Sequence, residues 1–183
     1  MTCSLVVNSK SGNTRMVSGA IKRALQAAGV EFVHAAALSD DADADQVALE
    51  AQGACAADTV LVGFWCDKGA CTPSVATLLS ALHGKRVFLF GTCGFGADQS
   101  YYQQIIDRVT SNLADDAELV GWAMCQGKMG PAVKQRYEAM LEQDPENARF
   151  KMLLDNWFAA KDHPTKEDLD NMAAAAKKAV LGE

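Results

Sequence analysis

Short runs of consecutive apolar residues alternate with longer helical stretches along this chain of 183 residues. Runs such as Arg86–Phe90 contain neighbouring Val, Leu and Phe, which is typical of strands buried on both faces. Between the runs, stretches such as Thr14–Ala28 repeat apolar side chains at helical spacing. Buried strands that alternate with helices predict a parallel, doubly wound sheet covered by helices on both faces, which is the α/β class.

The expected elements follow one another from end to end of the chain. Strands are predicted at Cys3–Asn8, Val30–Ala36, Thr59–Trp65, Arg86–Phe90 and Glu118–Cys125. Helices are predicted at Thr14–Ala28, Asp43–Gln52, Pro73–Leu82, Ser100–Leu113, Pro131–Leu141, Glu146–Phe158 and Lys166–Leu181. We expect residues 1–183 to form a single domain, with a core of about residues 1–145 and a helical C-terminal extension of about residues 146–183.

Charge and cysteine usage argue against several classes of protein. With 17 basic and 23 acidic side chains the net charge is −6, which does not favour a nucleic-acid binder. The six cysteines include no CxxC pair and no histidine at zinc-finger spacing, so we expect no structural metal. Thr59–Cys66, the longest strongly apolar stretch, is shorter than the roughly 20 residues of a membrane helix. No signal-peptide pattern begins the sequence, so we expect a cytoplasmic protein with reduced thiols.

The loop after the first predicted strand is suited to bind a phosphate. Doubly wound sheets bind ligands at the carboxyl ends of their strands, and the N-terminus of the following helix offers free N–H groups and a positive dipole. The motifs of triphosphate, dinucleotide and phosphatase loops are absent, which indicates a phosphomonoester. A simpler alternative is that serine and asparagine only cap the helix. The candidate residues are Ser9, Lys10, Ser11, Gly12, Asn13 and Thr14.

This loop resembles that of the flavodoxin family, in which the pattern Ser/Thr-x-Ser/Thr-Gly-x-Thr holds the terminal phosphate of FMN. The resemblance implies a flavodoxin-like three-layer α/β/α sandwich, a five-stranded parallel sheet in the order 2-1-3-4-5, and FMN as the cofactor. It also assigns the flavin ring to the loops after the third and fourth strands. The residues concerned are Phe64, Trp65, Cys66, Asp67, Lys68 and Gly69 in the first of these loops and Thr92, Cys93, Gly94, Phe95 and Gly96 in the second.

Trp65 is the candidate to stack on one face of the flavin, because it ends its strand. Phe95, Tyr101 or Tyr102 would cover the other face, since the sequence lacks the Gly-Asp and tyrosine of classical flavodoxins there. The alternative for Trp65 is a core tryptophan that completes the strand. Lys128, after the fifth strand, is expected at the rim of the site.

Charged and thiol side chains also occur in the two ring loops. Lys68 would stabilise a negatively charged reduced flavin and raise its potential, whereas Asp67 and Asp98 would oppose this effect, so the sign of the net effect stays open. Cys66, Cys71 and Cys93 invite a redox or metal role, and small side chains that pack beside a ring explain them equally well.

Three further segments, at residues 63–69, 90–94 and 125–128, are similar to a narrower flavodoxin-like subgroup of anaerobic bacteria, the BilS-like proteins. That subgroup is associated with a bilirubin reductase. The similarity extends over most of the chain.

The resemblance favours an electron carrier that works between a reductase and an acceptor enzyme, because the loops contain no acid–base dyad or nucleophile triad. Acidic runs at Asp40–Asp45, Asp115–Glu118 and Glu142–Glu146 would steer basic redox partner proteins, or would serve solubility alone. One alternative is an FMN-dependent oxidoreductase that uses NAD(P)H to reduce a quinone or another small molecule. Another is a phosphate-sensing module without redox chemistry. The oligomeric state stays open.

Overall fold

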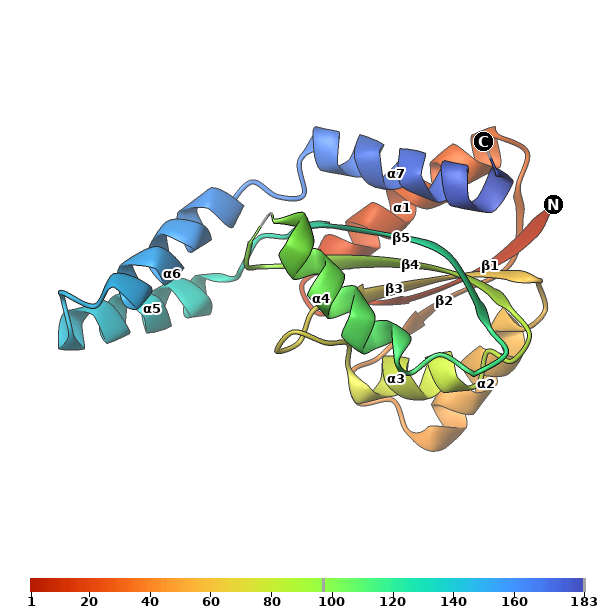
Figure 1. Cartoon of the computed structure of the whole chain (residues 1–183), viewed down its shortest axis with the longest axis horizontal. Coiled ribbons are helices and arrows are strands. Elements are labelled where there is room, and N and C mark those ends of the chain that lie inside the picture. Colours follow the sequence, from red (N-terminus) through yellow and green to blue (C-terminus); the bar gives the residue numbers. More distant parts are fainter. Residues whose placement is uncertain (97, 183) are drawn as a thin grey trace.

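Parallel strands form one sheet in the order β2-β1-β3-β4-β5 in the computed structural model, which describes residues 1–96 and 98–182 (Figure 1). The predicted fold class and strand order are confirmed. The strands are β1 (Thr2–Asn8), β2 (Glu31–Leu38), β3 (Thr59–Trp65), β4 (Arg86–Cys93) and β5 (Glu118–Gln126). All neighbouring pairs of strands are parallel, so their carboxyl ends meet at one edge.

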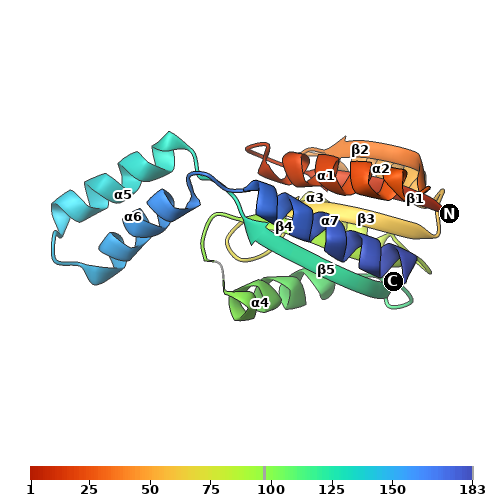
Figure 2. The same ribbon diagram turned by 90° about the horizontal axis from the view of Figure 1, so that it is seen from above.

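Helices cover both faces of the sheet (Figure 2). α1 and α7 bury their apolar sides against one face, and α2, α3 and α4 bury theirs against the other. The helices are α1 (Asn13–Ala27), α2 (Ala44–Ala54), α3 (Pro73–Ser80), α4 (Gln99–Thr110), α5 (Pro131–Gln143), α6 (Ala148–Ala160) and α7 (Lys166–Leu181). None of the helices in the described residues combines the length and the apolar character that crossing a membrane requires.

The central strands are buried on both faces, as their apolar runs predict. Two phenylalanines interlock β3 with β4, because the ring of each lies over a glycine of the other strand. A Cβ on Gly63 would lie 2.4 Å from the Phe90 ring, and one on Gly91 would lie 2.8 Å from the Phe64 ring. A larger residue at either glycine would displace a buried ring, so these positions fix how closely the two strands pack.

The C-terminal helices do not form one continuous extension of the core. α5 and α6 pack on each other and project away from the sheet as a hairpin, whereas α7 returns to lie beside α1 (Figures 1 and 2). Met172, Ala176 and Val180 of α7 are buried, and their spacing of four residues forms one apolar stripe. The helices are therefore grouped differently from the division expected near residue 145. Residues 166–181 belong to the sandwich, and residues 131–160 are the segment that leaves it.

Candidate functional site

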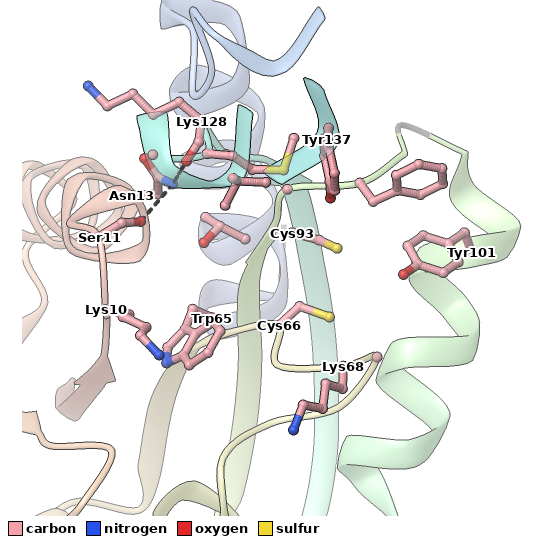
Figure 3. Close-up of a pocket in the computed structure, with 18 of the residues that line it drawn as sticks. Lys10, Ser11, Asn13, Trp65, Cys66, Lys68, Cys93, Tyr101, Lys128 and Tyr137 are labelled. Carbon is pink, nitrogen blue, oxygen red and sulfur yellow. Dashed lines mark hydrogen bonds between the residues drawn. The ribbon is translucent and has the colours of Figure 1, made fainter. Parts of the chain in front are cut away.

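A cavity of about 700 Å³ lies at the carboxyl edge of the sheet, where β1, β3 and β4 end, and α5 closes its outer side (Figure 3). Parallel α/β sheets bind their ligands at this edge. The structure brings the three predicted loops together here. The predicted residues that line the cavity are Lys10, Ser11, Asn13, Trp65, Cys66, Lys68, Gly69, Thr92, Cys93, Gly94 and Phe95.

The other predicted residues are not among those that line the cavity; they are Ser9, Gly12, Thr14, Phe64, Asp67 and Gly96. Phe64 differs most from its expected role. It is fully buried among the core side chains that α2, α3 and α4 cover. Since side chains alternate across a strand, β3 presents Trp65 at the cavity and Phe64 to this core. Phe64 therefore packs the sheet and does not line the cavity.

The loop between β1 and α1 turns at Gly12, whose φ of 90° lies in the left-handed region that favours glycine. As the residue before the helix, Gly12 offers no side chain to the free N–H groups of the first turn. Next to it, Asn13 Nδ2 donates to the Ser11 hydroxyl at 3.1 Å and to the Lys128 carbonyl oxygen at 2.8 Å. The loop is thus tied to the segment after β5, and the start of α1 keeps backbone donors for an anion.

The hydroxyl groups of Ser9 and Thr14 hold this loop by hydrogen bonds within the protein. The Ser9 hydroxyl accepts a hydrogen bond from the Arg15 backbone N–H at 3.2 Å. The hydroxyls of Thr14 and Thr92 are hydrogen-bonded at 2.9 Å, which ties the first helix to the end of β4. Ser9 and Thr14 therefore shape the loop from outside the cavity.

The segment after β3 forms a tight turn in which Asp67 and Ala70 exchange backbone hydrogen bonds of 2.9 and 3.0 Å. Both central residues are left-handed, with φ of 51° at Lys68 and 84° at Gly69. Arg108 Nη1 of α4 donates to the Gly69 carbonyl oxygen at 3.0 Å. The chain's own hydrogen bonds therefore set this turn, which carries Lys68 to the rim of the cavity.

Trp65 is held by its edge and leaves a face toward the cavity. Its Nε1 donates to Asp40 Oδ1 at 2.8 Å, and the same carboxylate oxygen accepts from Asn8 Nδ2 at 2.8 Å. The exposed Lys10 ammonium lies 4.7 Å from the centre of the Trp65 rings. These contacts orient an aromatic plane at the end of β3.

The loop after β4 is fixed by a residue from the hairpin. Asn156 of α6 donates to the Gly94 carbonyl oxygen at 2.9 Å and accepts from the Gly96 backbone N–H at 3.3 Å. Gln126 Nε2 adds a hydrogen bond of 3.1 Å to Asn156, and the Tyr102 hydroxyl donates to the Gly96 carbonyl oxygen at 2.6 Å. The hairpin therefore helps to hold one of the two predicted ring loops.

The outer wall of the cavity comes largely from residues that the sequence analysis missed. They lie on α4, on the segment after β5 and on the first turns of α5: Arg108, Gly127, Met129, Gly130, Val133, Arg136 and Tyr137. One usable signal was Pro131, because proline at the start of a helix just after β5 places its first turns at the carboxyl edge of the sheet. Lys128 lies at the rim, where it was expected.

Positive charge gathers around the cavity although the protein is acidic overall. No aspartate or glutamate is found among the described residues that line it. A concave surface of one charge sign attracts ligands of the opposite sign. The basic residues of the lining are Lys10, Lys68, Arg108, Lys128 and Arg136.

Two thiols of the floor titrate differently from one another. The Cys66 thiol, the Phe95 backbone N–H and the Tyr101 hydroxyl stabilise the thiolate of Cys93 and lower its pKa to about 7. The pKa of Cys66 is raised, first by its hydrogen bond with Cys93 and then by burial. Cys71, in the same loop as Cys66, has its pKa raised by burial to about 11. Of the three thiols, Cys93 is the one whose pKa is lowered.

Fold and site together define a class of protein. It is the flavodoxin-like class of parallel α/β proteins with strand order 2-1-3-4-5, which bind their ligand at the carboxyl edge beside the first loop. The family model described as Flavodoxin domain matches residues 4–177. The chain belongs to this family.

Two relatives are flavodoxin-like domain-containing proteins called BilS. That of Clostridium symbiosum (strain WAL-14163) is 35% identical over 176 residues, which cover 92% of this chain and 90% of the relative. That of Clostridioides difficile (strain CD3) is 32% identical over 124 residues, which cover 68% of this chain and 70% of the relative. Among solved structures, oxidised Flavodoxin 2 from Bacillus cereus aligns with a TM-score of 0.53 at 16% identity and covers 99% of both chains.

Proposed function

We propose that this protein binds FMN in the cavity and carries electrons between a reductase and an acceptor enzyme. The observation that carries the proposal is the meeting of a phosphate loop, an oriented aromatic plane and a ring of positive charge in one cavity at the ligand-binding edge of a flavodoxin-family fold. Bound FMN supplies the exchange of electrons, and the protein supplies binding, orientation and electrostatics.

The donor set at the first loop fits the phosphate of FMN. The start of α1 offers backbone N–H groups, Ser11 offers a hydroxyl, and Lys10 offers a positive charge at the same place. A phosphate dianion needs several donors and a compensating charge, and this loop supplies both. Lys128, whose carbonyl oxygen accepts from Asn13, lies beside the loop and adds a second charge.

A buried acceptor oxygen without a partner, at the same loop, suits the hydroxyl groups of FMN that lie between its phosphate and its ring. Asn13 is 6% exposed, and its Oδ1 is buried without a hydrogen-bond partner among the described residues. Leaving a buried acceptor unpaired costs about 1–3 kcal/mol, so a donor from a ligand would stabilise this arrangement. FMN carries hydroxyl groups between its phosphate and its ring, and these are donors of the required kind.

Trp65 would offer its plane to the ring. The Lys10 ammonium now lies over that plane, but an exposed cation–π contact stabilises by only about 0.5–1 kcal/mol. A hydrogen bond between charged groups stabilises by about 1.5–3 kcal/mol. Lys10 therefore favours the phosphate over the indole, and binding of FMN would move it away from Trp65.

The charges around the cavity bear on the redox potential of a bound flavin. Reduction adds negative charge to the ring, and nearby cations stabilise that charge. Lys68, Arg108 and Arg136 line the cavity, whereas Asp67 is not among the lining residues. The balance around the site therefore favours the reduced form.

The acidic runs differ in how they can serve a redox partner. Asp115–Glu118 leads into β5 and lies at the opposite edge of the sheet from the cavity. Glu142–Glu146 lies at the tip of the hairpin, between α5 and α6. Asp40–Asp45 follows β2 at the carboxyl edge, where Asp40 contacts Trp65. A partner that approaches the flavin would meet this third run and the cationic rim.

An enzyme that reduces a quinone or another small molecule with NAD(P)H is the second candidate. The wall of Met129, Val133 and Tyr137 favours it, because these apolar side chains line the outer part of the cavity. The two functions differ in what the isolated protein does with a nicotinamide cofactor and a quinone. A carrier needs an added reductase, whereas an enzyme oxidises NAD(P)H by itself.

The test is a titration of the flavin-free full chain with FMN, followed by flavin fluorescence. We expect saturation at one FMN per chain and bound flavin absorption bands. Riboflavin, which lacks the phosphate, is the matched control and should bind more weakly. A protein that binds neither, or binds both equally well, would contradict the proposal. NAD(P)H oxidation with a quinone is then measured with and without a flavin reductase.

A further inference from the structure

Cys66 and Cys93 occupy neighbouring positions at the ends of adjacent strands. In the β3–β4 ladder Trp65 pairs with Thr92, and the Cys66 backbone N–H donates to the Thr92 carbonyl oxygen at 2.9 Å. The two cysteines are thus the next pair along. Adjacent strands lie about 4.8 Å apart, which falls within the Cα separation of about 4.4–6.8 Å that a disulfide spans.

Both thiols also face the same space. Each lines the cavity, and Figure 3 shows their side chains projecting toward the same side, where the Tyr101 hydroxyl also points. The neighbouring Cys125 belongs to the core on the other face of the sheet, with α1 and α7, whereas Cys93 belongs to the core of α2, α3 and α4. Cys66 is therefore the partner that the fold presents to Cys93.

We propose that Cys66 and Cys93 form a redox-active dithiol that is reversibly oxidised to a disulfide by small disulfides of the glutathione class. The Cys93 thiolate attacks one sulfur of the small disulfide, forms a mixed disulfide and releases one thiolate. The Cys66 sulfur then attacks the Cys93 sulfur, gives its proton to the departing thiolate, and releases the second small thiol. Two protein thiols are oxidised, and one small disulfide is reduced to two thiols.

The surroundings divide these roles between the two sulfurs. Cys93 carries the lowered pKa that an attacking thiolate needs near neutral pH, and Cys66 keeps its proton until the mixed disulfide forms. Lys68 and Arg108 line the same cavity, so an anionic disulfide such as oxidised glutathione is attracted to it. Flavin binding is not needed for either step.

The experiment equilibrates the flavin-free full chain with mixtures of reduced and oxidised glutathione, blocks the remaining thiols and maps the peptides by mass. We expect the reversible loss of two free thiols and a peptide link between Cys66 and Cys93. A full set of free thiols under oxidising mixtures, or a link between other cysteines, would overturn the proposal. Because no flavin is present, this result is independent of FMN binding.

Matched variants separate the pair from the other thiols. The Cys71→Ser variant is the control and should form the same disulfide. The Cys66→Ser variant should stop at a glutathione adduct on Cys93, and the Cys93→Ser variant should lose the rapid reaction. The same disulfide yield in all three variants would contradict the assignment. Circular dichroism identifies any variant that fails to fold, and the peptide map of the unaltered chain still decides the proposal.

The pH dependence of alkylation gives an independent readout. Only thiolates react, so the rate at Cys93 should be half-maximal at about pH 7, whereas the rate at Cys71 should still rise toward about pH 11. At neutral pH we expect Cys93 to react on the order of a hundredfold faster, after allowance for its lower intrinsic nucleophilicity. The Tyr101→Phe variant should move the Cys93 profile to higher pH. Equal rates at the two cysteines would overturn the assigned roles.

Discussion

The sandwich and the α5–α6 hairpin are stabilised in different ways. The sandwich buries apolar side chains from both faces of the sheet, many of them fully. In the hairpin, Ala160 is the one residue of the two helices classed as buried in the described structure, and Met152 and Phe158 remain about half exposed. Because hydrophobic burial is the main source of stability, the cavity has a rigid floor and a wall that depends on a less stable element.

A few polar contacts connect that wall to the floor. Asn156 hydrogen-bonds the loop after β4 and accepts from Gln126 of β5 at 3.1 Å. Within the wall, Trp157 Nε1 donates to the Gly130 carbonyl oxygen at 3.3 Å, which ties α6 to the start of α5. The two parts of the cavity lining are therefore held in place by different means. The strand ends place the ligand-binding groups, and the hairpin adds apolar and basic side chains whose position depends on a small number of hydrogen bonds.

The largest expected difference between the two regions is in stability. Phe88 is fully buried on the α1–α7 side of the sheet, so Phe88→Ala should lower the free energy of unfolding by about 3–5 kcal/mol. Met152→Ala in the hairpin should change it by about 0.5 kcal/mol or less, because Met152 is 49% exposed. Chemical denaturation of both variants measures the two values. Similar losses would show that the hairpin is as well packed as the sandwich.

Binding of FMN is the next test, since it compares the floor with the wall. Trp65→Ala should weaken FMN binding by about 1–3 kcal/mol, because it removes an aromatic plane held by Asp40. Tyr137→Ala on α5 should weaken it less, because its support comes from the hairpin. Fluorescence titration of the two folded variants decides the order. A larger effect at Tyr137 would place the ring against α5.

The hydrogen bonds of Asn156, which connect the hairpin to the loop after β4, can be tested separately. Asn156→Ala removes both hydrogen bonds to the loop after β4 and should weaken FMN binding by about 1 kcal/mol. Hydrogen exchange at the Gly96 amide should also become faster, because that N–H loses its acceptor. Asp155→Ala, an exposed neighbour on the same helix, is the control and should change neither. Unchanged exchange at Gly96 would show that the loop holds itself.

The smallest expected effect is electrostatic. Lys68→Gln removes one positive charge at the rim and should lower the potential of bound FMN by about 10 mV for two electrons. This corresponds to about 0.5 kcal/mol, because the Lys68 side chain is exposed and its charge is screened by solvent. Lys151→Gln, on the outer part of the hairpin, is the matched control with the same charge change. Potentials are measured against reference dyes at low and high salt. Equal shifts in the two variants would mean that net charge, not position, sets the potential.

Much of the fold followed from local patterns in the sequence. The apolar runs predicted the strands, and the first loop carried a recognisable motif between the first strand and the first helix. The site was predicted in part. Trp65 and Cys93 were expected at the cavity because they end strands, and Ser11 because it lies in the loop after β1; Arg136 and Tyr137, which also line the cavity, were missed. Pro131 indicated that a helix begins at this edge of the sheet, but no local pattern indicated which of its side chains would line the cavity.

The sequence by itself therefore determined which segments are strands and which loops follow them, because these depend on residues close together in the chain. Tertiary structure alone decided that α7 joins the sandwich while α5 and α6 leave it, that basic side chains from several elements surround one cavity, and that Cys66 meets Cys93. The physical reason is that the sequence near an apolar stripe, a charge or a thiol does not specify which distant residue it will contact. Those contacts form only when segments far apart in the sequence pack together.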